Sequence, residues 1–596
     1  MLTKPRRNRH YTTSALLLST GIVGLYLLFN FSTQLQPVLP PLAAQRNLQH
    51  WLIDNSDQLM QNEPLYHLAT VAEIYQRTNY QLLWFKDYQL SEAGQQLLQQ
   101  LLETSADELR DYHYHSTYLH QRLHHVQTLP REATGLDILL SDAFVSYAED
   151  VLNDNLLPDI IEGNPFPRNP LLPSSLKPTA YQPPSITQAP ILTGHIVHDD
   201  IIELIVDNPE PGMLKNVLQR MTPAHPEYHR LRTELNHFRS LLSNNQWQPL
   251  PQGPNLKKGD RHSQVAQLRH MLKNYNDYPN DSNTPDPHSK TPIKYSEYFD
   301  NNLQIALKKF QHRHGKKPSG ILTPPTRKLL NINPSQRIKQ LALNMKRWRQ
   351  LPSQLGERYI WVNMTNYRLQ LINNNQTELE MRVIVGKPYR QTPVLQEFIR
   401  TVVLNPTWNV PRRITLYDIL PHAKKDPGYL SQRNISVFKS WSATEPIDLD
   451  QIDWDNASPK NFPYRLQQAA GDDNALGMVK FVIPNDLSIY LHDTNHRNLF
   501  KRDMRSLSSG CVRVEKPLEL AYALLKGKTG WNKKRIQATL ASKKTTYIRL
   551  PQNIPTYLMY WTAWVDKNGI LNFRDDIYKH DLAHFRTPQD ADSLIL

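Results

Sequence analysis

YLHDT at residues 490–494 and SSGCVRV at residues 508–514 are the two most informative motifs of the chain. They contain His492 and Cys511. A thiol is a weak nucleophile until it loses its proton, and a nearby imidazole can take that proton or hold the thiolate as an ion pair. These two side chains are therefore candidates for a base and a nucleophile, and the alternative is an inert buried cysteine beside a hydrogen-bonded histidine.

The residues next to this pair supply further parts of a reactive site. Gly510 permits close backbone approach and a positive φ, and the amides of such a turn can point at a developing oxyanion. Arg513 is a fixed positive charge that can hold a carboxylate or lower the pKa of the thiol. Tyr490 precedes the histidine by two residues and so lies on the same side of a strand. Core packing is the alternative role for the ring of Tyr490.

The sequence around both motifs favours a mostly-β domain. Short β-branched or alternating runs predict strands at residues 359–362, 368–371, 381–385, 402–404, 479–483, 488–491, 547–550 and 557–565. Residues 566–569 (DKNG) form a hairpin-turn sequence. Residues 412–474 interrupt the strands with mixed helix and loop sequence, and we expect this long insertion to be a lid.

Composition and charge exclude several classes of protein. The chain has 596 residues with 39% hydrophobic and 21% charged residues, which indicates several globular domains. The net charge is +14, but no Lys/Arg block interleaved with aromatic residues occurs beyond the N-terminus, so nucleic acid is not an expected partner. The single cysteine excludes a disulfide within the chain and a cysteine-rich zinc site.

A metal site is the second reading of the histidine motif. His492 and His496 have the spacing of two ligands on one helix face. Their context predicts a strand that enters a loop, where the two rings would not converge. We therefore expect no metal ion and no other cofactor.

The N-terminus predicts an exported protein. Four cations between Lys4 and Arg9 precede an apolar run from Ala15 to Phe31, and no acidic residue occurs before Asp54. This pattern is typical of a single-pass inner-membrane protein with a cytoplasmic N-terminus and a periplasmic catalytic part. A soluble periplasmic protein after signal cleavage is the alternative.

Helical sequence precedes the β domain. After the basic tail and anchor or signal at residues 1–44, residues 45–252 predict a helical scaffold, with a stiff proline-rich segment at residues 158–190. In residues 253–333, the order G…V..L…L, then FQ..HG…G…T..LL, resembles a small three-helix peptidoglycan-binding module. Residues 334–357 predict a helix that returns to the scaffold.

The two motifs around His492 and Cys511 resemble the signature of L,D-transpeptidase catalytic domains. Residues 358–580 are similar to that domain in the large, anchored periplasmic members, and residues 581–596 form a C-terminal tail. Three further segments resemble those that flank the family's lid: NPTWNVP at residues 405–411, DPGY at 426–429 and NALG at 474–477. The resemblance implies a multidomain α+β chain with an anchor helix, a helical scaffold, the small module and a mostly-β catalytic domain with a lid.

The resemblance also implies a reaction. Cys511 would attack the carbonyl that joins an L-centre to a D-amino acid in a peptidoglycan tetrapeptide stem, with release of D-alanine and formation of a thioester. His492 would then activate the amine of a second stem, which gives a 3-3 cross-link. Water as acceptor would make the enzyme an L,D-carboxypeptidase, and a lipoprotein as acceptor would make it an attaching transferase. A non-catalytic wall-binding scaffold is the alternative outside the enzymes.

Further roles and partners follow from the same resemblance. Ser509 stands where histidine is commoner, and its backbone carbonyl would orient His492. Gly510 and Tyr490 complete the orienting and oxyanion group. Arg513 and Trp408 are expected to bind substrate, with core packing as the alternative for Trp408. The implied partners are peptidoglycan stems and glycan, the inner membrane through the N-terminal helix, and other wall-synthesis enzymes.

Overall fold

The structure is a computed structural model of the chain. It describes residues 43–584 except 55–58, 61–62, 105–113, 124–129, 154–197, 208–210, 222, 224, 245–246, 279–296, 353 and 427. The predicted proline-rich segment 158–190 and the tail from residue 585 lie outside the described residues.

The predicted inner-membrane location requires a correction. Among the helices of the described residues, none is long and apolar enough to cross a bilayer. The apolar run from Ala15 to Phe31, on which the prediction rested, lies outside the described residues. The prediction of a single-pass membrane protein is therefore not upheld.

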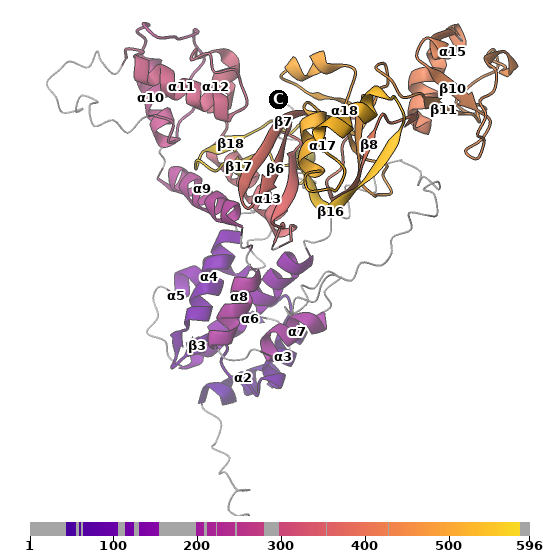
Figure 1. Cartoon of the computed structure of the whole chain (residues 1–596). Coiled ribbons are helices and arrows are strands. Elements are labelled where there is room, and N and C mark those ends of the chain that lie inside the picture. Colours follow the sequence, from indigo (N-terminus) through magenta and orange to yellow (C-terminus); the bar gives the residue numbers. More distant parts are fainter. Residues whose placement is uncertain are drawn as a thin grey trace, which may run out of the picture. The chain divides into compact units, whose positions relative to one another are not determined.

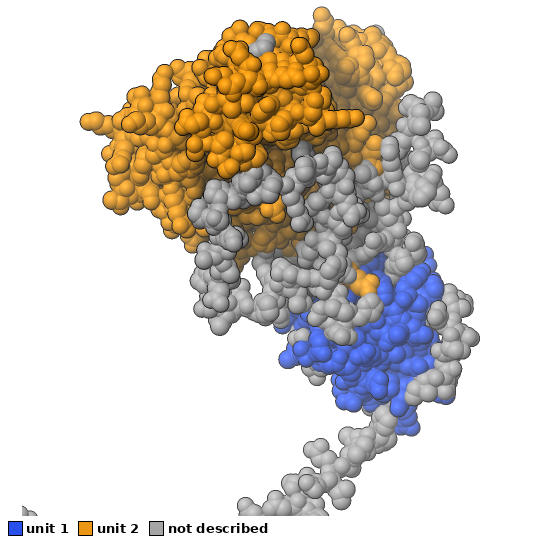
Figure 2. All heavy atoms as spheres, turned by 90° about the vertical axis from the view of Figure 1, so that its right-hand side faces the viewer, with its two compact units in different colours: residues 1–99, 112–147, 197–218 blue, residues 100–111, 148–196, 219–596 orange. Residues whose placement is uncertain are grey.

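The chain forms two compact units (Figure 2). The first contains residues 1–99, 112–147 and 197–218, and the second contains residues 100–111, 148–196 and 219–596. The helical part of the chain consists of α2 (Ala43–Asp54), α3 (Leu68–Arg77), α4 (Glu92–Thr104), α5 (Ser116–Leu123), α6 (Pro130–Asn153), α7 (His198–Val206) and α8 (Pro211–Met221). Two small hairpins lie between these helices, namely β1 (Leu59–Met60) with β2 (Glu63–Pro64), and β3 (Phe85–Lys86) with β4 (Gln89–Leu90).

Helix α6 organises the first unit through a buried carboxylate. Asp137 accepts hydrogen bonds from the amides of Leu83 and Trp84 at 3.0 and 2.8 Å, and from the hydroxyl of Tyr75 at 2.6 Å. Burial raises the pKa of Asp137 to about 6. The carboxylate thus satisfies donors of a loop that would otherwise be buried without partners.

The small module in the second unit has the predicted helical core. Its helices are α10 (Gln264–Asn274), α11 (Asn301–Arg313) and α12 (Pro324–Leu330). Val265, Leu268, Leu307 and Phe310 are almost fully buried in one cluster. Asp300 precedes helix α11, and its side chain accepts from the amide of Leu303 and so caps the helix.

Two helices on either side of the module in the sequence pack together. They are α9 (Pro226–Ser243) and α13 (Pro334–Arg349), and both contribute to a cluster that also contains the C-terminal strands of the chain. Trp348 of α13 stacks on Trp561 and Trp361, with ring centroids 4.6 and 5.5 Å away. The module is thus an insertion between two helices that share a hydrophobic cluster with strands of the β domain.

The β domain is built on one sheet that closes on itself. Within the described residues the sheet has nine strands in the order β14-β7-β15-β13-β12-β8-β16-β5-β6, and β6 also pairs with β7. The strands are β5 (Arg358–Asn363), β6 (Arg368–Asn373), β7 (Gln376–Gly386), β8 (Leu395–Leu404), β12 (Val479–Val482), β13 (Leu491–His492), β14 (Ser506–Ser508), β15 (Val512–Val514) and β16 (Thr546–Met559). Because β6 pairs with both β5 and β7, β6 has no unpaired edge that could pair with another chain.

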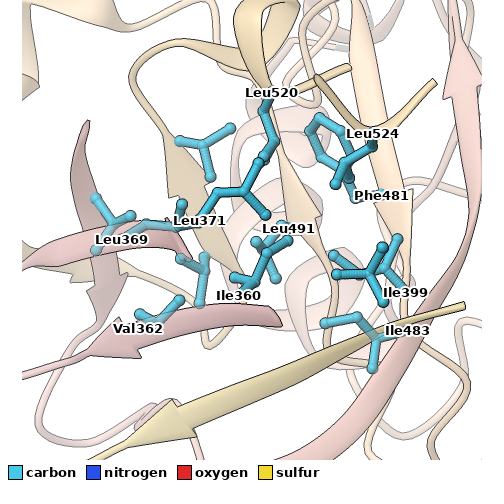
Figure 3. Packing of buried hydrophobic residues seen from close by; sticks show 14 of the residues in the cluster. Ile360, Val362, Leu369, Leu371, Ile399, Phe481, Ile483, Leu491, Leu520 and Leu524 are labelled. Atoms are coloured by element: carbon cyan, nitrogen blue, oxygen red, sulfur yellow. The ribbon is translucent and has the colours of Figure 1, made fainter. Parts of the chain in front are cut away.

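The core of this domain lies between the sheet and α17 (Pro517–Leu524). Figure 3 shows Leu520 and Leu524 of this helix near Phe481 and Leu491 of the sheet. Each such fully buried side chain contributes roughly 1.5–3 kcal/mol to the free energy of unfolding. Around this core lie η5 (Arg497–Lys501), α18 (Lys533–Ala541), β17 (Ala563–Val565), β18 (Leu571–Phe573) and α19 (His580–His584).

The insertion between β8 and β12 has a core of its own. Its elements, grouped in orange in Figure 1, are β9 (Trp408–Asn409), α14 (Arg412–Ile414), η3 (Thr415–Ile419), α15 (Leu420–Lys425), α16 (Gly428–Ser431), β10 (Ile435–Phe438), η4 (Leu449–Gln451) and β11 (Arg465–Gln468). Strands β10, β11 and β9 form a small sheet, and Leu420, Leu430, Val437 and Leu466 are buried together. We call residues 408–468 the insert.

Candidate active site

Strands β13 and β15 bring the two motifs together. The strands are parallel neighbours in which Leu491 pairs with Val512 and His492 pairs with Arg513. The amide of Val512 donates to the carbonyl of Tyr490 at 3.1 Å. Paired residues share a face of a sheet, and successive residues alternate. Leu491 and Val512 are fully buried in the core, so the histidine, the arginine, Tyr490 and Cys511 lie on the opposite face.

Burial is the largest influence on the pKa of the Cys511 thiol. The residue is half-buried, and Sγ lies 3.6 Å from the carbonyl oxygen of Ser488. Burial raises the pKa of the thiol above its usual value, whereas Tyr490 and the charge of Lys480 act in the opposite direction. The free protein therefore holds a neutral thiol at pH 7.

The imidazole of His492 is also neutral in the free protein. The residue is 5% exposed. Burial and the charges of Arg513 and Lys480 lower its pKa to about 3. Its ring meets that of Tyr490 edge to face, with centroids 5.6 Å apart. An uncharged imidazole has a free lone pair and can act as a base.

No hydrogen bond to Nδ1 orients the ring of His492 within the described residues. Its Nδ1 is buried and has no hydrogen-bond partner among the described residues. The carbonyl of Ser509 therefore does not hold Nδ1 in this structure, and an orienting role of that carbonyl stays a prediction.

Lys480 is a charged neighbour that the sequence did not reveal. It lies on β12 and pairs with His492, while its Nζ lies 3.8 Å from the ring centroid of Tyr490. Burial lowers its pKa, and the thiolate form of Cys511 would act in the opposite direction. In the sequence, the one sign of this role is a single lysine within the apolar run of residues 479–482. A lysine on the solvent-exposed face of a strand would give the same pattern.

Tyr490 and Trp408 lie near the same face. Burial raises the pKa of Tyr490 well above its usual value, the charge of Cys511 adds to this effect, and a hydrogen bond with Trp408 opposes it. Trp408 is half-buried on β9, pairs with Gln468 and packs on the core of the insert. Core packing thus describes part of its surroundings, and a place in a substrate cleft stays a prediction.

The turn that contains Cys511, residues 508–511, is held by local hydrogen bonds. Ser508 Oγ donates to the carbonyl of Cys511 at 2.6 Å and accepts from the amide of Gly510 at 3.2 Å. Gly510 has φ +119°, a conformation in which a side chain would be strained. We call residues 508–511 the Cys511 turn.

A second loop supports this turn, and sequence reasoning missed it. Thr392 Oγ1 donates to the carbonyl of Gly510 at 2.6 Å, and Arg390 Nη1 donates to Ser509 Oγ at 3.0 Å. A Cβ on Gly386 would lie 2.1 Å from the carbonyl oxygen of Arg390, so the loop closes too tightly for any side chain there. We call residues 386–394 the Arg390 loop.

The C-terminal part of the domain holds the Arg390 loop in turn. Tyr578 Oη donates to the carbonyl of Gly386 at 2.8 Å and accepts from the amide of Thr392 at 3.3 Å. His580 Nε2 lies 2.8 Å from Gln391 Oε1. No local pattern could predict these contacts, because Tyr578 and Gly386 are 192 positions apart.

His492 and His496 lie in different surroundings. His492 is buried at the end of β13, whereas His496 is exposed. In the part of the chain that the structure describes, no group of three or more His, Cys, Asp or Glu side chains is placed to hold a metal ion. Asp493 instead accepts from the amides of Met478 and Thr494 and from Arg497.

Comparison with known families assigns the domains. Residues 357–536 match the family described as "L,D-transpeptidase catalytic domain", residues 261–330 match "Putative peptidoglycan binding domain", and residues 69–235 match "Scaffold domain". The chain therefore contains the catalytic domain of an L,D-transpeptidase, which is an enzyme class, together with a peptidoglycan-binding domain.

A curated relative agrees with this class. A Haemophilus influenzae protein named "Putative L,D-transpeptidase" is 44% identical over 257 residues, which is 43% of this chain and 50% of the relative. The chain thus spans about half the length of this relative. A Clostridium acetobutylicum structure titled as a fused Zn-dependent amidase/peptidase/peptidoglycan-binding protein covers 51% of this chain at 11% identity. Its TM-score of 0.13 is too low to support any argument.

Proposed function

We propose that this protein is a cysteine L,D-transpeptidase that cross-links peptidoglycan tetrapeptide stems through a thioester. The observation that carries the proposal is the pairing of β13 with β15, because it puts His492 and Cys511 on one face of a domain that matches this enzyme class. The peptidoglycan-binding domain supports stems and glycan as partners. Association with other wall-synthesis enzymes stays a prediction.

Acylation begins with two neutral groups. As the sulfur of Cys511 attacks the carbonyl before the terminal D-alanine, its proton passes to His492, and the charge that develops on sulfur makes the imidazole more basic. Amides of the Cys511 turn and the hydroxyl of Tyr490 stabilise the oxyanion. The C–N bond then breaks, the imidazolium gives its proton to the leaving amine, and D-alanine departs from a thioester.

Deacylation uses the same groups in reverse order. His492 takes a proton from the side-chain amine of a second stem, the amine attacks the thioester carbonyl, and the C–S bond breaks to restore the thiol. The product is a 3-3 cross-link. Arg513 and Lys480 place positive charge on this face and are suited to a stem carboxylate. Water in place of the amine gives the carboxypeptidase reaction.

The insert and the domain boundaries have proposed roles as well. Residues 412–474 act as a lid, Trp408 lines the cleft on the lid's side, and Ser509 helps to orient the site. Residues 358–580 form the catalytic domain, and residues 253–333 form the binding module. The separate core of the insert supports the lid proposal, because a segment with its own core can move as a body.

Mass spectrometry tests the proposal directly. The full chain is incubated with disaccharide-tetrapeptide, and both intact protein and products are measured. We expect an adduct at Cys511, loss of D-alanine and formation of dimers. The Cys511→Ala variant should give none of these while it still binds sacculi, and His492→Gln should acylate slowly. Folded wild-type protein that gives no adduct and no product would leave only the wall-binding scaffold.

A further inference from the structure

Arg390 joins the Cys511 turn to the insert. The residue is 9% exposed. Its Nη1 donates to Ser509 Oγ at 3.0 Å, and the same guanidinium forms a two-point ion pair with Asp418, in which Nη2 donates to Oδ1 at 2.9 Å and Nη1 donates to Oδ2. One buried side chain thus contacts both the residue two positions before Cys511 and a carboxylate of the insert.

The two ends of this bridge differ in burial. Asp418 lies on η3, and its side chain is 40% exposed, whereas that of Arg390 is 10% exposed. The Nε of Arg390 is buried without a hydrogen-bond partner among the described residues. A buried guanidinium depends strongly on its carboxylate partner, because water cannot readily replace it. The state of Arg390 therefore depends on whether the insert is docked.

The Cys511 turn has other contacts as well, because the amide of Lys387 donates to the carbonyl of Ser508 at 3.0 Å and Sγ lies 3.6 Å from the carbonyl oxygen of Ser488. The bond from Thr392 to the carbonyl of Gly510 also comes from the Arg390 loop. Three residues of the Arg390 loop thus contact three successive residues of the turn, Ser508, Ser509 and Gly510. A shift of Arg390 would reach Ser509 through one hydrogen bond, and the backbone of Gly510 connects Ser509 to Cys511.

We propose that Arg390 is a positioning residue that transmits docking of the insert, through Asp418, to Ser509 and so to the geometry of the Cys511 turn. The inference rests on the proposed transpeptidase function and adds its regulation: the thiol is correctly placed only while the insert is docked. Arginine suits this role, because its planar fork can hold a carboxylate at two points and a hydroxyl at the same time.

A double-mutant cycle in the full chain tests the transmission. The variants are Asp418→Asn, Ser509→Ala and the double variant, with Arg390→Lys as a fourth. The readouts are kcat and KM with disaccharide-tetrapeptide, and the rate of Cys511 alkylation by iodoacetamide, which needs no transpeptidation. Glu378→Gln is the matched control, because Glu378 forms a two-point pair with Arg358 in the same domain and has no contact with the turn.

We expect Asp418→Asn and Arg390→Lys each to lower kcat about tenfold with little change in KM, as expected for misplacement of a reacting group. Alkylation should become faster in Asp418→Asn, because the turn loosens when Arg390 loses its ion pair. The double variant should be no slower than the slower single variant. Glu378→Gln should match the wild type in both readouts.

Three outcomes would overturn the inference: a wild-type kcat and alkylation rate in Asp418→Asn, additive effects of Asp418→Asn and Ser509→Ala, or an equal effect of Glu378→Gln. Thermal melting of each variant separates these outcomes from unfolding. A wild-type chain that forms no product contradicts the proposed function instead, and the alkylation cycle still decides whether Asp418 and Ser509 are coupled.

Discussion

At the scale of single residues, the free site is a neutral pair. Burial raises the pKa of Cys511 and lowers that of His492 to about 3, so no thiolate–imidazolium ion pair forms at pH 7. The proton therefore moves from Cys511 to His492 only when bound substrate excludes water from this face and the oxyanion donors bind the developing charge.

The pH dependence of alkylation follows from this neutrality. The rate of reaction of Cys511 with iodoacetamide should rise continuously from pH 6 to beyond pH 9, because the pKa of the thiol lies above its usual value and the thiolate fraction keeps growing over this range. His492→Gln should leave this profile nearly unchanged. A plateau near pH 7 in the wild type that disappears in His492→Gln would indicate an ion pair and contradict the neutral pair.

The same histidine affects the stability of the fold at acid pH. In the unfolded chain His492 binds a proton near pH 6.5, whereas in the folded protein it does so only near pH 3. The folded state binds fewer protons in this window, so the free energy of unfolding falls as the pH falls from 6.5 to 3. His492→Gln should remove up to about 4 kcal/mol of this loss, measured by urea unfolding at several pH values. Equal pH slopes in both proteins would refute the assignment.

At the scale of elements, the site depends on segments outside the matched catalytic domain. Tyr578, which lies beyond residues 357–536, holds the Arg390 loop, and that loop holds the Cys511 turn. The nucleophile is thus supported by strands and loops from both ends of the domain.

Removal of one hydroxyl tests this support. Tyr578→Phe leaves the buried ring in place and deprives Gly386 and Thr392 of a hydrogen-bond partner. We expect a loss of about 1–2 kcal/mol in the free energy of unfolding and a lower kcat with tetrapeptide. Tyr547→Phe is the control, because Tyr547 is 71% exposed. A Tyr578→Phe variant as stable and active as the control would show that the contact is not needed.

At the scale of the whole second unit, one aromatic cluster joins helices and sheet. Trp348 lies against Trp361 and Trp561, so the helix after the binding module packs on strands of the β domain. The module therefore begins and ends on elements that the sheet holds in place.

Removal of the Trp348 ring should destabilise the aromatic cluster. Trp348→Ala should lower the free energy of unfolding by about 3–5 kcal/mol, the usual loss for a large buried aromatic residue. Trp441→Ala, at a tryptophan that is 45% exposed on the insert, should change it by less than about 1 kcal/mol. Urea unfolding followed by circular dichroism compares them, and equal losses would exclude a central role for the cluster.

Much of the architecture could be predicted from local pattern. The helices of the binding module, the change to strands at Arg358 and the hairpin at residues 566–569 agree with the structure, because the period of apolar residues reports which face is buried. The shared side of Tyr490 and His492, and that of Cys511 and Arg513, follow from alternation along a strand. The membrane location was the error, since composition of an N-terminal run was taken as decisive.

By itself, then, the sequence determined the reactive residue types, the order of the domains and the faces of the strands, because these depend on neighbours a few positions apart. Only the tertiary structure decided that β13 lies beside β15, that Lys480 and Tyr578 belong to the site, and that Arg390 connects Ser509 with Asp418. These contacts join residues that are distant in the chain, and they arise from closure of the sheet and from the need of buried polar groups for partners.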